Sequence, residues 1–299
     1  MTWIEPERYP VPVAGGDLSV ARWGDGSRVV VASHGITANS CSFGEVAAQL
    51  LARGADVSLH AVDHRGRGRS ATVPGPYGLE AHARDLVAVL DHLDVASAVL
   101  VGHSMGAYVV ACAAELAPER VDGLVLVDGA LPIPVDLPPD PDIEAIVRGV
   151  IGPALDRLDT TFGSPDEYVE MWRSHPAVGG EHFTDVAEAY VRYDLVPDGE
   201  LWRSPVSKTA VLADGKSILR DEGPRTAILR VETPTTLLWA PRGVLGDEPG
   251  LLPADLVDRT VPQLPHVEAE LVPGVNHYSI LLTDPGATAV ASAIERHLR

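Results

Sequence analysis

The 299-residue sequence contains only two cysteines, Cys41 and Cys112. Two cysteines do not form a disulfide framework, and Cys112 falls in an apolar stretch where we expect a small buried hydrophobe. No apolar run approaches the roughly 18 residues that a membrane span requires. Residues 1–6 do not combine a basic segment with an apolar one, so we expect no signal peptide. These absences predict a cytoplasmic protein.

Basic residues are scarce. The chain has 23 lysines and arginines against 42 aspartates and glutamates, which gives a formal net charge of −19. Such an acidic protein is a poor partner for nucleic-acid backbones and for anionic membrane surfaces. We therefore expect neither as a partner, and nothing in the sequence indicates an oligomeric state. The hydrophobic fraction of 45% and the length suit one large domain with an insertion.

Short β-rich runs alternate with helical patterns through most of the chain. Apolar residues recur at helical spacing over 79–93, and an amphipathic helix is predicted near 285–298. Alternation of this kind predicts an α/β fold with a mostly parallel sheet covered on both faces. The expected strands are 17–23, 28–33, 57–62, 98–101, 121–127, 235–240 and 267–272.

The alternation is interrupted in the middle of the chain. Residues 131–141 contain five prolines, which suit a linker and neither a strand nor a helix. Helical segments with scattered aromatic residues follow. We interpret residues 132–231 as a helical cap inserted over the carboxyl edge of the sheet, between two parts of one core, 1–131 and 232–299.

The pentapeptide GHSMG at 102–106 lies between a predicted strand and an apolar helical segment. This is the strand–turn–helix context of a nucleophile elbow, with Ser104 at the apex. Glycines at both ends lack a Cβ, so the strand and the helix can approach closely around the turn. We therefore predict that Ser104 is a catalytic nucleophile.

A serine hydroxyl needs a neighbouring base and donors that stabilise the oxyanion. His277 lies in a loop just after a predicted strand, at the edge where α/β sheets place their sites, and is the expected base. The expected oxyanion donors are two backbone N–H groups: that of Met105, the residue directly after Ser104, and that of Ile36, in the turn after strand 28–33.

Four motifs follow one another along the chain: HGIT (34–37), DHRGRGRS (63–70), GHSMG (102–106) and NHY (276–278). Their order resembles the α/β-hydrolase superfamily. The resemblance is to its capped branch of esterases, lactonases, epoxide hydrolases, haloalkane dehalogenases, cofactor-free haloperoxidases and C–C bond hydrolases. It implies an eight-stranded sheet, a Ser/acid/His triad and no cofactor. Epoxide hydrolases and dehalogenases of this branch carry aspartate at the position of Ser104, which argues against both.

The resemblance also implies where the triad acid lies. In this family the acid usually follows the strand predicted at 235–240, and the first carboxylate there is Asp247. It precedes His277 by 277 − 247 = 30 residues, which leaves room for a helix and a strand. Asp128, at the end of strand 121–127, and Glu248 are the alternatives. We favour Asp247.

The predicted function is a serine hydrolase that cleaves an ester or lactone of a small to medium, apolar substrate through an acyl-enzyme. Two alternatives stay open. C–C bond hydrolysis or perhydrolysis would use the same triad, and a non-catalytic ligand-binding protein would use the same fold.

Two further patterns do not support a cofactor or a metal. Residues 66–71 fit G-x-G-x-x-A, but Pro-Gly-Pro at 74–76 follows in place of the helix that would hold a pyrophosphate. His60 and Asp63 point to opposite sides of a strand, and His64 adds no evident third ligand. We expect neither a cofactor nor a metal.

Overall fold

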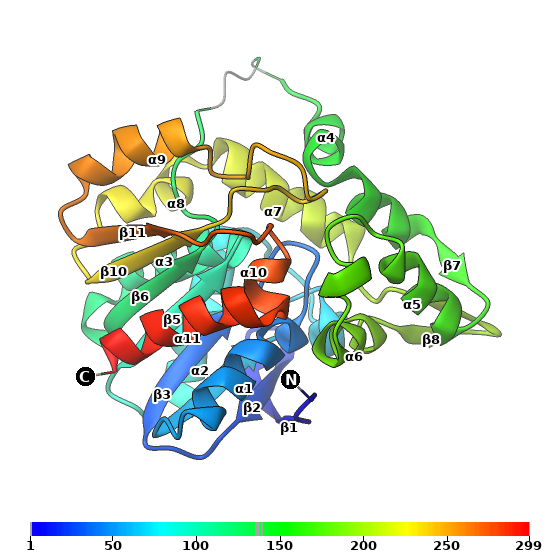
Figure 1. Cartoon of the computed structure of the whole chain (residues 1–299), viewed down its shortest axis with the longest axis horizontal. Helices are drawn as coiled ribbons and strands as arrows, with labels where there is room; N and C mark the ends of the chain where they lie inside the picture. Colours follow the sequence, from blue (N-terminus) through cyan, green and yellow to red (C-terminus); the bar gives the residue numbers. More distant parts are fainter. Residues whose placement is uncertain (1, 135–137, 139, 299) are drawn as a thin grey trace.

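The computed structural model describes residues 2–134, 138 and 140–298. Its centre is an eight-stranded sheet in the order β1-β2-β4-β3-β5-β6-β10-β11 (Figure 1). Strand β2 pairs antiparallel with both β1 and β4, and the other neighbours are parallel. The strands are β1 Glu7–Val13, β2 Gly16–Trp23, β3 Arg28–Ser33, β4 Val57–Val62, β5 Ala98–His103, β6 Val121–Val127, β10 Thr235–Trp239 and β11 Val267–Leu271.

The α/β fold predicted from the sequence is confirmed, and each predicted strand and helix lies within two residues of its expected bounds. Strand β1 was not predicted, because Pro10 and Pro12 argue against a strand. It is an edge strand that pairs only with β2, and prolines are tolerated at such an edge.

Helices cover both faces of this sheet (Figure 1). Adjacent residues of β3 show why: Val31 belongs to the cluster packed against α2 and α3, and Val30 to the cluster packed against α1 and α11. The strand period of two sends successive apolar side chains to opposite faces. The core helices are α1 Gly44–Ala52, α2 Leu79–His92, α3 Met105–Leu116, α9 Ala254–Thr260, α10 Ser279–Leu282 and α11 Asp284–His297.

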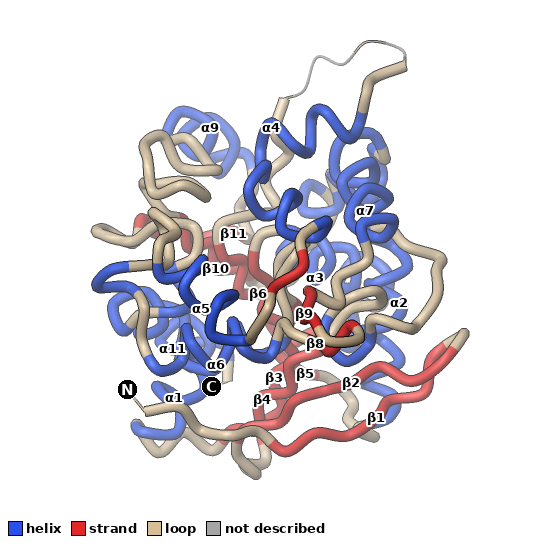
Figure 2. The backbone as a smooth tube through the Cα atoms, turned by 90° about the vertical axis from the view of Figure 1, so that its right-hand side faces the viewer, coloured by secondary structure: helices blue, strands red, loops and turns tan. Residues whose placement is uncertain are grey.

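The segment between β6 and β10 contains a small sheet besides its helices, which the sequence did not reveal. Strands β7 Thr161–Phe162, β9 Leu201–Arg203 and β8 Val196–Asp198 form it in that order. Figure 2 shows helices α4 and α7 side by side on the same part of the molecule. The helices of this segment are α4 Ile143–Asp156, α5 Pro165–Arg173, α6 Asp185–Tyr193, α7 Lys208–Arg220 and α8 Glu222–Arg225.

The aromatic residues of this segment mostly form its own core. Tyr168, Trp172 and Tyr190 are buried together, with Phe162 against them. At the far end of the segment, Ala227 and the residues around it pack into the main core beside α3. The cap boundaries at 132 and 231 stay a prediction, and residues 135–137 and 139 of the proline-rich linker lie outside the described residues.

Over the described ranges, none of the helices combines the length and the apolar character that a bilayer crossing demands.

Buried histidines give the fold a predicted sensitivity to acid. Burial lowers the pKa of His34 and of His60 from 6.5 to about 4. Between these values the unfolded chain binds a proton that the folded protein does not, so stability falls as the pH falls from about 6.5 to about 4. Each such histidine contributes a slope of roughly 1.4 kcal/mol per pH unit.

We therefore expect the free energy of unfolding, measured with urea between pH 7.5 and pH 4.5, to decline steeply below pH 6.5. The variant His60→Gln should reduce that slope by roughly 1.4 kcal/mol per pH unit, because it removes one titrating group. A free energy of unfolding that stays constant down to pH 5 would contradict this expectation.

Candidate active site

Ser104 occupies a sharp turn between β5 and α3. Its φ of 56° and ψ of −118° lie outside the usual regions for a residue with a side chain, and its N–H donates to the carbonyl of Val127 at 2.9 Å. A Cβ on Gly102 would lie 2.2 Å from the carbonyl oxygen of Gly106, and one on Gly106 would lie 2.0 Å from that of Ser33. The turn therefore requires both glycines of the predicted elbow.

His277 lies in the loop after β11, as expected. Its N–H donates to the carbonyl of Arg242 at 3.0 Å, and its own carbonyl accepts from Nε2 of His103 at 2.8 Å. His277 and Ser104 line the same two pockets. The structure thus brings together the two residues that the sequence placed 173 positions apart (277 − 104).

The carboxylate beside His277 belongs to Asp128. Its Oδ2 lies 2.6 Å from Nδ1 of His277, and its Oδ1 accepts from the N–H of Ala240 at 3.1 Å. Asp128 is fully buried. Because a carboxylate only accepts, Nδ1 of His277 is the protonated nitrogen, and Nε2 is left to accept a proton.

The prediction that Asp247 orients His277 is wrong. Residues 243–247 form a tight turn, closed by the Gly243 N–H donating to the Asp247 carbonyl at 2.8 Å, and the Asp247 side chain is exposed. The turn places Val244, not Asp247, in the pockets beside Ser104. Glu248 is exposed as well.

Asp128 reaches His277 because of the turn that follows β6. Asp128 has a φ of 49°, which turns the chain out of the strand direction. The N–H of Asp128 donates to the Leu238 carbonyl of the neighbouring β10 at 2.7 Å. A Cβ on Gly129 would lie 2.3 Å from the Ser104 carbonyl oxygen, so this turn lies directly against the elbow. The sequence contained one signal for Asp128 as the acid: it stands at the end of the strand that neighbours the elbow strand.

The two expected oxyanion donors lie beside Ser104. Ile36 lines both pockets, and among the described residues its N–H has no hydrogen-bond acceptor. Met105 is the first residue of α3, where backbone N–H groups have no acceptor within the helix, and it lines one pocket. Their role in stabilising an oxyanion stays a prediction.

His103 was not singled out from the sequence, yet it supports the base. Its ring lies 4.6 Å from that of His277, centre to centre. Burial, and then the proximity of His277, hold the pKa of His103 well below its ordinary value. His103 is therefore neutral, donates from Nε2 to the His277 carbonyl, and adds no positive charge next to the base.

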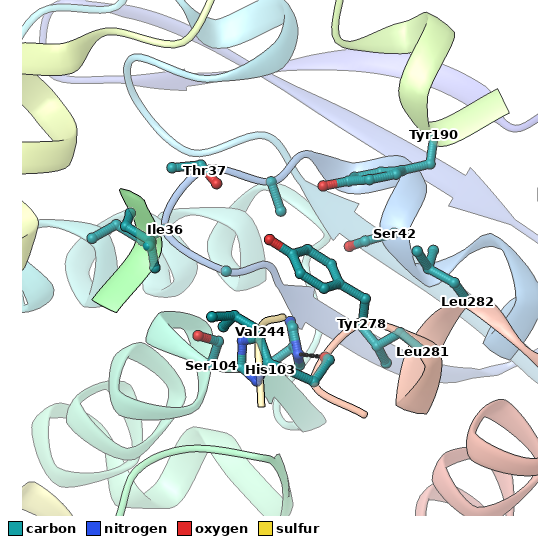
Figure 3. A pocket seen from close by; sticks show the side chains of 14 residues that line it. Ile36, Thr37, Ser42, His103, Ser104, Tyr190, Val244, Tyr278, Leu281 and Leu282 are labelled. Atoms are coloured by element: carbon teal, nitrogen blue, oxygen red, sulfur yellow. Dashed lines mark hydrogen bonds between the residues drawn. The ribbon is translucent and has the colours of Figure 1, made fainter. Parts of the chain in front are cut away.

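Two pockets meet at Ser104 and His277. The smaller, with a volume of about 40 Å³, has Ser104 and Val244 at one end and Tyr190 with Leu282 at the other (Figure 3). The larger, of about 130 Å³, is walled mainly by apolar side chains from α3, α4 and α7, among them Met105, Tyr108, Val147 and Ile218. A group attached to Ser104 thus adjoins a larger apolar pocket and a smaller, narrower pocket.

In the part of the chain that the structure describes, no three histidine, cysteine, aspartate or glutamate side chains are grouped so that they could hold a metal ion.

Comparisons with known proteins agree with this architecture. A family model described as the alpha/beta hydrolase fold matches residues 28–167. A 2-(acetamidomethylene)succinate hydrolase of Mesorhizobium japonicum is 27% identical over 267 residues, which cover 87% of this chain and 85% of the relative. Rhodomycin D methylesterase DnrP of Streptomyces peucetius is 35% identical over 207 residues, 62% of this chain and 60% of the relative.

Solved structures share the fold over nearly the full length. The crystal structure of E-2-(acetamidomethylene)succinate hydrolase superposes with a TM-score of 0.77 at 21% identity, covering 97% of this chain and 99% of the other. Matches to some curated relatives are partial, and two of them span only 26% and 40% of the relative's length. The sheet order, the matched family model and the shared overall architecture show that this chain has the α/β-hydrolase fold.

Proposed function

We propose that the protein is a serine hydrolase that cleaves a carboxylic ester or lactone with a neutral, largely apolar substrate body. The observation that carries this proposal is the 2.6 Å contact between the buried Asp128 and Nδ1 of His277, which lines the same pocket as the strained, partly exposed Ser104. A serine, a base and a carboxylate that orients the base are the parts that nucleophilic acyl transfer requires.

The proposed reaction proceeds in two halves. The Oγ of Ser104 attacks the carbonyl carbon while Nε2 of His277 takes its proton, and the tetrahedral oxyanion accepts from the N–H groups of Ile36 and Met105. The carbon–oxygen bond to the leaving group then breaks, and Nε2 returns the proton to the departing alcohol. Water attacks the acyl-enzyme by the same route and releases the acid and Ser104. Asp128 orients the His277 ring throughout and stabilises the imidazolium while Nε2 carries the proton.

The lining of the pockets favours a neutral substrate. Among the described residues that line them there is no lysine or arginine, so neither pocket offers a cation to a substrate carboxylate. One relative is named a methylesterase, and another is named for the hydrolysis of a succinate. The absence of a lining cation supports the ester reading over a dicarboxylate substrate for this chain.

Turnover of p-nitrophenyl esters tests the proposal directly. We expect hydrolysis of acetate to octanoate esters, and mass-spectrometric labelling of Ser104 by a fluorophosphonate. An ester or a lactone releases an alcohol or a hydroxy acid, whereas C–C bond hydrolysis of a diketone would release a ketone. A folded protein that turns over no ester or lactone and resists the fluorophosphonate would contradict the proposal and favour a ligand-binding role.

The larger pocket should set the size of the group that is accepted. Ile218 of α7 lines it, so Ile218→Phe fills apolar space next to Ser104. We expect the ratio of kcat/KM for octanoate over acetate ester to fall about tenfold, a typical worth of apolar pocket contacts. Leu229→Phe, at an exposed position, is the control and should leave the ratio unchanged. An unchanged ratio in Ile218→Phe would place the acyl chain elsewhere.

A further inference from the structure

Two buried arginines hold the turn that carries Ile36. Nε of Arg67 donates to the Ile36 carbonyl at 3.0 Å, and Nη2 of Arg157 donates to the Thr37 carbonyl at 2.7 Å. The side chains of both arginines are nearly inaccessible, at 0% and 3% exposure. Two successive peptide carbonyls of one turn therefore each accept a charge-assisted hydrogen bond, the stronger class of such bonds.

Each arginine is also paired with a carboxylate from the segment between β6 and β10. Arg67 lies 2.6 Å from Oδ2 of Asp214, on α7, and Arg157 lies 2.9 Å from Oδ2 of Asp194, just after α6. Arg157 itself belongs to this segment, whereas Arg67 follows β4. The turn is thus clamped from two directions, and each clamp depends on a buried carboxylate of the inserted segment.

Burying an ion pair costs desolvation free energy, so a gain in folding stability does not by itself account for these two pairs. Here the two pairs converge on neighbouring peptides, those that follow the Ile36 N–H in the chain. Fixing the Ile36 and Thr37 carbonyls fixes the rotation of the turn, and with it the direction of the Ile36 N–H. A donor aimed in advance stabilises an oxyanion without reorganising during the reaction.

We propose that Arg67 and Arg157 are positioning residues that hold the Ile36 N–H toward Ser104, so that the inserted segment contributes to the rate of acyl transfer as well as to substrate choice. This inference rests on the proposed hydrolase function. It assigns to Asp214 and Asp194 the task of keeping the two guanidinium groups in place. Neither arginine is among the described residues that line the two pockets at Ser104, so neither is placed to touch the substrate.

The test is the division between kcat and KM in Arg67→Lys and Arg157→Lys. Lysine keeps the charge but cannot donate to a carbonyl and a carboxylate with a fixed fork. With p-nitrophenyl acetate we expect kcat to fall about 10- to 100-fold in each variant, less than the loss of a whole oxyanion donor. KM should change less than about threefold, because ground-state contacts are kept. The affinity for a boronic acid that forms a tetrahedral adduct with Ser104 should fall by the same factor as kcat.

Arg65→Lys is the matched control. Arg65 is buried, and its side chain forms a 2.6 Å ion pair with Asp85 and donates to two backbone carbonyls outside the turn of Ile36, those of Ala14 and Pro74. Its backbone carbonyl accepts from Nη1 of Arg67, and this contact is kept when only the side chain is changed. Arg65→Lys should lose stability to a similar extent, measured as Tm, and keep kcat within twofold. If either arginine variant does not fold, the near-isosteric Asp194→Asn and Asp214→Asn replace it, with the same expected pattern in kcat and boronate affinity.

Assays of the wild-type protein distinguish a failure of this inference from a failure of the proposed function. If it neither hydrolyses the esters nor reacts with the fluorophosphonate, the hydrolase assignment fails. If it does both, but the arginine variants keep kcat within twofold, the positioning role is overturned. It is equally overturned if Arg65→Lys loses as much kcat as they do, because loss of kcat would then follow loss of stability.

Discussion

Replacing Ser104 with alanine is expected to lower kcat for ester hydrolysis by at least about three orders of magnitude, and up to about 10⁶-fold. Alanine removes the Oγ that would form the acyl-enzyme and leaves His277 with no nucleophile to activate. The residual rate would come from water attack assisted by the oxyanion donors and by binding alone. The measurement is kcat with p-nitrophenyl butyrate, together with loss of fluorophosphonate labelling.

The fold should survive this change. Alanine keeps the Cβ that the turn already accommodates, and the backbone N–H of residue 104 still donates to the Val127 carbonyl. The near-native Tm and circular dichroism of Ser104→Ala therefore act as its control. Ser42→Ala, which removes another hydroxyl from the smaller pocket, should cost less than tenfold in kcat. Turnover by folded Ser104→Ala within tenfold of wild type would refute the serine mechanism.

Replacing Asp128 with asparagine is expected to lower kcat by about four orders of magnitude. The asparagine oxygen can still accept from the N–H of Ala240, so the local structure is kept. Its neutral amide, however, cannot stabilise the imidazolium of His277 and allows the ring to hold its proton on Nε2, the wrong nitrogen for a base. The loss should appear in kcat far more than in KM, measured with the same ester.

Asp247→Asn provides the comparison. Asp247 is exposed in the 243–247 turn and has no contact with His277, so its replacement should change kcat less than twofold. Full activity in Asp128→Asn, combined with inactivation in Asp247→Asn, would mean that the loop after β10 rearranges and supplies the acid after all.

The elements around the site could be predicted because their signals are local. The apolar runs that form β3 and β4 and the glycines that flank Ser104 each specify a strand or a turn within a few residues. The position of His277 after the last strand followed from the same alternation of strands and helices. Strand β1 was missed because its prolines are acceptable only at a sheet edge, and being an edge strand is a property of the assembled sheet.

The identity of the acid depended on the tertiary structure. Asp128 and His277 are 149 residues apart, and their contact follows from how far the turn after β6 swings toward β10 and which side chain the 243–247 turn presents to the site. The clamp of Arg67 and Arg157 on the turn of Ile36 arises in the same way, from side chains of separate segments that meet only when the chain is folded. The sequence by itself determined every strand of the main sheet except β1, the elbow with Ser104 and the histidine loop, because short-range pattern and glycine geometry fix them. Only the tertiary structure decided which carboxylate and which guanidinium groups surround them, because a buried charge is placed by its partners across the fold and not by its neighbours in the chain.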